Sequence, residues 1–167
     1  MMTYMRRGRS EAANSKSAPF SASHRLAVRV YYEDTDFSGV VYHASYLRFL
    51  ERGRTEFLRA LGIEHRRIFA DGGEGSFHFV VRAMTIEFLK PALMDDELFV
   101  ETQVSATRGA SIEMEQKIWR EEVILLTAKV RIAVVAGGKP RRIPAEVLAR
   151  FKTPAHAGPR GVGGPGS

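Results

Sequence analysis

The feature that most constrains the fold of this chain is a single change in the spacing of its apolar residues. Between positions 46 and 61 apolar or small residues recur every three to four positions, which lays one stripe along an α-helix. Gly62 then supplies a left-handed position at which that helix is expected to end. From residue 79 to residue 135 the period is two, which is typical of β-strands whose faces differ. The helical stripe comprises Tyr46, Leu50, Gly53, Phe57 and Leu61.

Turn residues divide the region of period two into four expected strands. A further strand is expected ahead of the helix, over 26–33, where β-branched and aromatic residues alternate. The connections are too short for crossover helices, so neighbouring strands are antiparallel. The sequence therefore predicts an α+β domain in which one long central helix packs on a curved antiparallel sheet of about five strands. The four later strands are expected over 79–88, 98–104, 112–118 and 123–135, with breaks at Pro91, Arg108-Gly109 and Gly137-Gly138.

Composition limits the chemistry and the partners. The chain has 167 residues, the size of one domain, and no cysteine, which excludes a disulfide framework, a thiol nucleophile and a zinc–thiolate site. We predict no cofactor and no metal. The net charge of +6 indicates an anionic partner. Many of the basic residues lie in the flanking segments 6–25 and 139–160, where solvated tails are the simplest interpretation, and the aromatic interleaving of a nucleic-acid surface is missing.

The two ends differ from the middle of the chain. Residues 1–24 are rich in Ser, Ala and Arg but lack the apolar middle of a secretory signal, so we predict a disordered extension. Residues 25–152 form the expected domain, and 153–167 an expected disordered tail rich in Gly and Pro. No apolar run reaches the roughly 18 residues of a membrane span. We therefore expect a soluble, cytoplasmic protein without stable membrane insertion.

The densest polar cluster lies between the first strand and the helix. The first N–H groups of a helix are unpaired and carry partial positive charge, so they stabilise a carbonyl oxygen that gains negative charge. A carboxylate such as Asp36 beside them would activate water or attack directly. Spacing alone leaves a second interpretation open, in which Asp34 and Asp36 only cap turns and His43 only lies near the helix start. The cluster comprises Glu33, Asp34, Thr35, Asp36, Ser38, Tyr42, His43 and Ser45.

Several separated segments of the chain resemble one known family. These segments occur in one order across about 25–152, which makes the match more specific than any single motif. They resemble the YbgC-type acyl-CoA thioesterases of bacteria, relatives of 4-hydroxybenzoyl-CoA thioesterase. The matching segments are 32–36 (YEDTD), 39–46 (GVVYHASY), 51–56 (ERGRTE), 79–88, 91–92, 95–98 and 107–111.

The resemblance implies a hotdog fold, assembled as a homodimer or homotetramer, and it assigns roles in the loop. Asp36 would be the catalytic carboxylate, acting as general base on water or as nucleophile through a mixed anhydride. His43 would assist positioning or proton transfer. Backbone N–H groups of Val41, Tyr42 and His43 would polarise the thioester carbonyl. We expect substrate contacts at Gly39, Val40, Val41 and Tyr46, and at Arg108 as a cation for coenzyme A phosphates.

Other residues have weaker cases. Glu51 lies on the helix about 80° around the axis from His43, so a salt bridge to Arg54, or contact with solvent on the Thr55 side, is the simpler expectation. Asp34 is expected to organise the turn. Alternative cations for the phosphates are Lys129, Arg131 and Arg142, and apolar candidates for an acyl pocket, more simply read as core, are Phe57, Phe79 and Met84.

The favoured function is hydrolysis of short- to medium-chain acyl-CoA. A hotdog enoyl-thioester hydratase is an enzymatic alternative, although its chemistry would favour a His base over the Asp36 motif. The alternative from another class is a non-catalytic acyl-thioester or acyl-carrier-protein binding module of a cell-envelope system, because YbgC relatives are associated with Tol-Pal.

Overall fold

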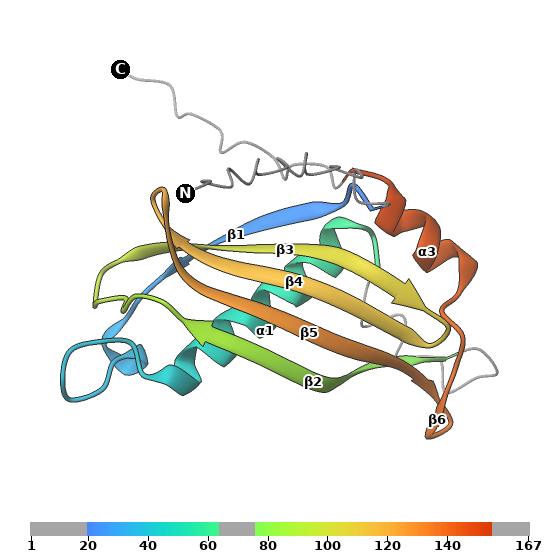
Figure 1. Ribbon diagram of the computed structural model, residues 1–167, viewed down its shortest axis with the longest axis horizontal. Helices are drawn as coiled ribbons and strands as arrows, with labels where there is room; N and C mark the ends of the chain where they lie inside the picture. The colour runs from blue at the N-terminus through green and yellow to red at the C-terminus, as the bar shows by residue number, and fades with distance from the viewer. Residues whose placement is uncertain (1–19, 64–75, 155–167) are drawn as a thin grey trace, which may run out of the picture.

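A curved antiparallel sheet wraps one long helix in the computed structural model of the chain (Figure 1). The structure describes residues 20–63 and 76–154. The strand order is β1-β3-β4-β5-β2, and β6 pairs with β5. This is the predicted α+β architecture. The elements in chain order are β1 (Ser23–Arg29), the 3-10 turn η1 (Tyr32–Asp34), α1 (His43–Ala60), β2 (His78–Phe88), β3 (Glu97–Arg108), β4 (Ser111–Arg120), β5 (Val123–Ala136), β6 (Lys139–Pro140) and α3 (Ala145–Lys152).

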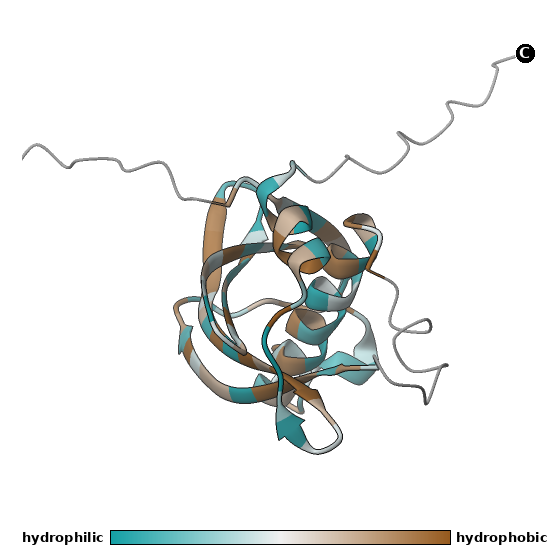
Figure 2. Cartoon of the chain, turned by 90° about the vertical axis from the view of Figure 1, so that its right-hand side faces the viewer, coloured by the Kyte–Doolittle hydropathy of each residue, from teal (hydrophilic) through white to brown (hydrophobic). Residues whose placement is uncertain are grey.

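The period of two buries one face of β3, β4 and β5 in the core that surrounds α1. In β3 the residues that point to the helix are Leu98, Val100, Thr102 and Val104, and all four are buried. A view turned by 90° shows the sheet curling around the helix (Figure 2). Burial on this inner face is what holds α1 in place, because most helical stability in proteins comes from packing of the apolar face.

Gly53 allows α1 to lie close to the sheet. A Cβ atom at this position would be 2.6 Å from Cγ1 of Val100, well inside van der Waals contact. At the end of the helix Gly62 has a φ of 72°, so the predicted left-handed residue is present. The apolar stripe is buried as expected at Tyr46, Leu50, Phe57 and Leu61, and Phe49 beside it is buried as well.

The first strand is shorter than predicted. It ends at Arg29, and the residues expected to continue it to position 33 enter η1 instead. The Asp34 carboxylate accepts a hydrogen bond from the Tyr31 N–H at 3.0 Å, which draws the chain into a turn. The strand also begins at Ser23, with Ala22 buried, so ordered structure starts before the predicted boundary at residue 25.

A short C-terminal helix, α3, was missed by the sequence analysis. The aromatic rings of Phe151 and Phe57 stack with centroids 6.3 Å apart, and Phe151 is fully buried. Arg150 donates to the Leu61 carbonyl at 3.1 Å, close to the end of α1. Basic residues assigned to a solvated tail therefore belong to ordered structure. The parts of the predicted disordered ends at 1–19 and 155–167 lie outside the described residues.

In the described part of the chain, no helix is long and apolar enough to cross a membrane.

Candidate active site

The loop between η1 and α1 folds back on itself at Gly39. The Asp36 N–H donates to the Val40 carbonyl at 2.9 Å, and the Gly39 N–H donates to the Asp36 carbonyl at 3.0 Å. Gly39 has a φ of 80°, a conformation that glycine adopts without strain. Thr35 and Val41 form a β-bridge that closes the loop. The turn therefore brings the backbone of Asp36 alongside the residues that lead into α1.

The Asp36 carboxylate is exposed, and one of its oxygens is fixed. Oδ1 accepts hydrogen bonds from the Ser38 hydroxyl and from the Ser38 N–H, the latter at 2.8 Å. The hydroxyl contact, followed by the backbone contact, holds the pKa of Asp36 below its ordinary value. Among the described residues no group donates to Oδ2. The side chain is thus an ionised carboxylate at neutral pH with one oxygen free to act.

The backbone donors at the start of α1 differ from those expected. The Val41 N–H donates to the Ala92 carbonyl and the Tyr42 N–H to the Asp34 carbonyl, both at 2.9 Å. Both groups are therefore already engaged. Within residues 20–63 and 76–154, the N–H groups of His43 and Ala44 have no backbone acceptor, as the first turn of a helix dictates. Of the expected donors Val41, Tyr42 and His43, only the His43 N–H is free of a backbone acceptor among the described residues, together with that of Ala44.

Asp34 organises this loop from below. It is buried, and besides the Tyr31 N–H its carboxylate faces Arg48 at 3.6 Å. Arg48 also donates to the hydroxyl of the buried Ser45 at 3.1 Å. The prediction that Asp34 organises the turn is confirmed.

A surface groove of about 300 Å³ opens beside the helix start. His43 is exposed at its edge, and its ring lies 4.4 Å from that of Tyr42. Tyr46 is buried at its base, where its hydroxyl accepts the Ala92 N–H at 3.0 Å and burial raises the pKa of its phenol. Asp36, Gly39 and Val40 do not line this groove. Its lining consists of Val41, His43, Tyr46, Phe88, Leu89, Lys90 and Pro91.

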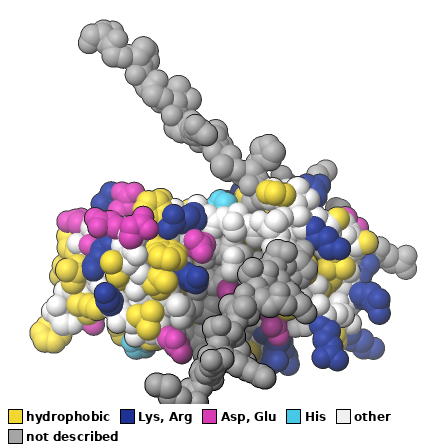
Figure 3. Space-filling model, turned by 45° about the horizontal axis from the view of Figure 1, so that its top comes forward, with side chains coloured by type: hydrophobic (Ala, Val, Ile, Leu, Met, Phe, Trp, Pro, Cys, Tyr) yellow, Lys and Arg dark blue, Asp and Glu magenta, His cyan; other side chains and the backbone are white. Residues whose placement is uncertain are grey.

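Arg108 is not brought near Asp36 within one chain. It ends β3, whose 12 residues span roughly 36 Å, whereas Glu97 begins that strand near the active-site loop. Basic side chains gather at the right-hand end of the molecule in Figure 3, the end that carries β6 and α3 in Figure 1. A single chain therefore separates Asp36 from the predicted phosphate contact at Arg108.

The remaining candidates mostly have structural contacts. Glu51 is exposed and accepts a hydrogen bond from the Thr55 hydroxyl at 2.9 Å, whereas Arg54, the expected salt-bridge partner, donates to Gln116 instead. Phe57 is fully buried, and Phe79 and Met84 pack against the core. Lys129 and Arg131 line a separate hollow on the sheet. In the described part of the chain no group of three or more His, Cys, Asp or Glu residues is placed to hold a metal ion.

Comparison with known proteins assigns the family. The family model described as the thioesterase-like superfamily matches residues 30–151. The chain belongs to this superfamily. The acyl-CoA thioesterase YbgC of Haemophilus influenzae is 47% identical over 126 residues, which cover 74% of this chain and 90% of that protein. The acyl-CoA thioester hydrolase YbgC of Escherichia coli is 44% identical over 131 residues, covering 77% and 95%.

A solved structure with more than half of its sequence identical to this chain has the same fold. A probable thioesterase from Bartonella henselae has a TM-score of 0.68 and 52% sequence identity, and the match covers 74% of this chain and all of that one. The resemblance and the hotdog architecture predicted from sequence are thus confirmed.

Two polar residues that support the loop at 35–42 from the connection between β2 and β3 were not expected from the sequence. Asp96 and Arg120 form an ion pair at 2.7 Å beside residues 91–93. The Asp95-Asp96 pair was part of the family resemblance, but neither periodicity nor spacing indicates that its carboxylate reaches Arg120, 24 positions away.

Proposed function

We propose that the protein hydrolyses acyl-CoA thioesters and that Asp36 is its catalytic carboxylate. The observation that carries this proposal is the Asp36 side chain itself: ionised, exposed, with one oxygen fixed by Ser38 and the other free. Membership of the thioesterase-like superfamily and the acyl-CoA activity in the names of the two YbgC relatives support the substrate class. We propose short- to medium-chain acyl groups.

The chemistry requires attack on the thioester carbonyl carbon. Asp36 removes a proton from water as the water oxygen bonds to that carbon, or bonds to it directly to give a mixed anhydride that water then opens. The carbonyl oxygen becomes an oxyanion, which the free His43 and Ala44 N–H groups at the start of α1 stabilise. The carbon–sulfur bond breaks, and the thiolate takes a proton, for which the donor we propose is His43, exposed at the start of α1. The products are a carboxylate and free coenzyme A.

Asp36→Asn tests this assignment. It keeps the size and a hydrogen-bond acceptor but removes the basic oxygen, so thiol release from a panel of acyl-CoA esters is expected to fall by at least about 10²-fold. Glu33→Gln is the matched control, since Glu33 is an exposed carboxylate in the same loop region. Unchanged release by Asp36→Asn would contradict the catalytic role. Binding of acyl-CoA or acyl carrier protein without any release by the wild type would favour the non-catalytic module.

We further propose that the active unit is at least a homodimer paired along β2. This strand ends the sheet, and within the described residues its outer edge pairs with no other strand. Val80 and Val81 on it are 41% and 46% exposed. Antiparallel pairing of two β2 strands would bring the basic end of one copy, with Arg108, toward the active-site end of the other. In that arrangement Arg108 of one copy could contact the phosphates of a coenzyme A bound to the other. The mass of the intact chain in sedimentation tests whether it is a dimer.

The carrier and the location remain part of the proposal. An acyl carrier protein is a second candidate carrier, which the same thiol-release assay compares with coenzyme A. We also propose a cytoplasmic location, a reducing compartment that a chain without cysteine suits.

A further inference from the structure

The position of the active-site loop depends on a segment outside the sheet. Residues 91–93 lie in the connection between β2 and β3. Val40 forms a β-bridge with Leu93, and the Val41 N–H donates to the Ala92 carbonyl at 2.9 Å. Because Asp36 is in turn bonded through its N–H to the Val40 carbonyl, a shift of residues 91–93 moves the backbone that carries the carboxylate.

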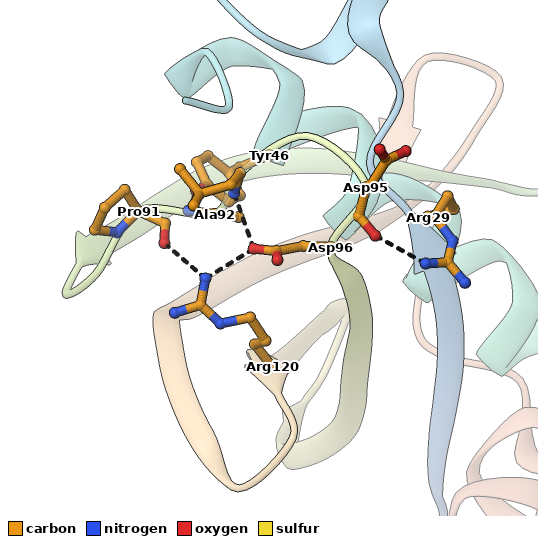
Figure 4. Close-up of polar contacts among 8 residues, drawn as sticks. Arg29, Tyr46, Pro91, Ala92, Asp95, Asp96 and Arg120 are labelled. Atoms are coloured by element: carbon orange, nitrogen blue, oxygen red, sulfur yellow. Dashed lines mark hydrogen bonds and ion pairs between the residues drawn. The ribbon is translucent and has the colours of Figure 1, made fainter. Parts of the chain in front are cut away.

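Asp96 and Arg120 also bond to residues 91–93, in addition to the contacts that these residues make with Val40 and Val41 (Figure 4). Asp96 Oδ2 accepts the Leu93 N–H at 2.9 Å and the Arg120 Nη1 at 2.7 Å. Arg120 Nη1 also reaches the Pro91 carbonyl, at 3.5 Å. The hydroxyl of Tyr46, on α1, accepts a hydrogen bond from the Ala92 N–H. Each of the residues 91–93 is thus hydrogen-bonded to one side chain: that of Tyr46 in α1, that of Arg120 in β4, or that of Asp96 just before β3.

A neighbouring ion pair offers a comparison within the same connection. Arg29 contacts Glu97 at 2.7 Å, with side chains 46% and 51% exposed, and donates to the Asp95 carbonyl at 2.8 Å. In Figure 4 Arg29 lies on the side of the connection away from Pro91 and Ala92. The Arg120 and Asp96 side chains are only 33% and 20% exposed. Partial burial and the bonds to backbone make the second pair the more restrictive of the two.

We propose that Asp96 and Arg120 are positioning residues that fix the Asp36 loop through residues 91–93. Neither side chain lines the groove beside His43, so they act through the backbone rather than on substrate. The inference rests on the proposed thioesterase function for its kinetic readout. Its structural readout, amide exchange in the loop, is independent of any activity.

Asp96→Asn is the primary test, with Glu97→Gln as the matched control one residue away. Asp96→Asn keeps an oxygen for the Leu93 N–H but removes the charge that holds Arg120. We expect kcat to fall about tenfold to 10²-fold with KM within about threefold, because misplacing a reacting group by an ångström costs turnover of that order. Arg120→Met should give the same loss, and the double variant no more than either single one, because both changes break one contact.

Hydrogen exchange separates positioning from general damage. In Asp96→Asn the amides of Asp36 and Val41 should exchange faster, while those of the β3–β4 ladder stay protected. Unchanged loop exchange, an equal kcat loss in Glu97→Gln, or additive losses in the double variant would overturn the proposal. If Asp96→Asn fails to fold, Arg120→Met carries the same measurements. An inactive wild type defeats the proposed function only, since the exchange result still decides the positioning role.

Discussion

Two polar clusters of this protein, one in the loop before α1 and one between α1 and the sheet, hold their side chains in different ways. The loop cluster, residues 35–42, which includes the proposed catalytic carboxylate of Asp36, holds that carboxylate through a contact from Ser38, two residues along the chain. The inner cluster joins α1 to the sheet across long sequence separations. There Arg54 donates to Gln116 at 2.9 Å, and Gln116 donates to the Leu50 carbonyl and the Thr102 hydroxyl, both at 2.9 Å.

The difference follows from what each cluster has to do. Asp36 is exposed and keeps one oxygen free, as its proposed role of catalytic base requires. Gln116 is 1% exposed and Arg54 8%, so their polar atoms have to find partners inside the protein. Burial lowers the pKa of Arg54, and the nearby charge of Glu51 opposes this shift. Activity and stability are therefore expected to reside in different polar residues, and the following substitutions test that separation.

Removing the centre of the inner cluster should have the largest effect on stability. Gln116→Leu preserves the approximate volume but leaves the buried Arg54 guanidinium without its acceptor, so the free energy of unfolding should drop by about 3 kcal/mol. Urea unfolding measures it. Gln103→Leu, on the outward-facing side of the neighbouring strand, is the control and should change stability by less than about 0.5 kcal/mol. Equal effects in the two variants would erase the distinction between the clusters.

The close approach of α1 to the sheet gives the next largest effect. Gly53→Ala places a methyl group 2.6 Å from Val100 Cγ1. Overpacking of this kind costs about 1–3 kcal/mol, offset by about 1 kcal/mol from the better helix propensity of alanine. We expect a net loss of about 1 kcal/mol in thermal or urea unfolding. Arg52→Ala, on the exposed face of the same helix, should stabilise or change little; a stabilising Gly53→Ala would show that the interface has room.

The smallest effect is expected in the loop and is a change in pH dependence. Ser38→Ala removes the hydroxyl that favours the charged form of Asp36, so the pKa of Asp36 rises toward its ordinary value. A higher pKa means less ionised Asp36 in acid, so the acidic limb of kcat should move to higher pH while turnover at neutral pH stays nearly constant. Ser38→Thr keeps the hydroxyl and is the control. An acidic limb that stays in place would mean that another group governs it.

The sequence predicted the helix, the longer strands and the family correctly, for reasons that are local. The three-to-four spacing of 46–61 and the period of two after 79 are properties of neighbouring residues. The helix α3 was missed because its basic residues dominated the pattern, although Val147 and Phe151 carry the helical spacing of its buried face. Its stability comes from contact with Phe57, 94 positions earlier, which no local pattern reveals.

In the loop before α1, some features could be predicted from the sequence and others depend on tertiary structure. Sequence by itself placed Asp36, His43 and a turn at Gly39 ahead of a helix, because residue type and spacing carry that information. Tertiary structure decided which backbone N–H groups remain free. The Val41 N–H donates to the carbonyl of Ala92, which lies in the connection between β2 and β3. Asp96 and Arg120 hold that connection in turn. A backbone N–H is available to a substrate only if no acceptor of the protein already binds it. Tertiary structure decides this, because it brings in acceptors from residues far away in the sequence.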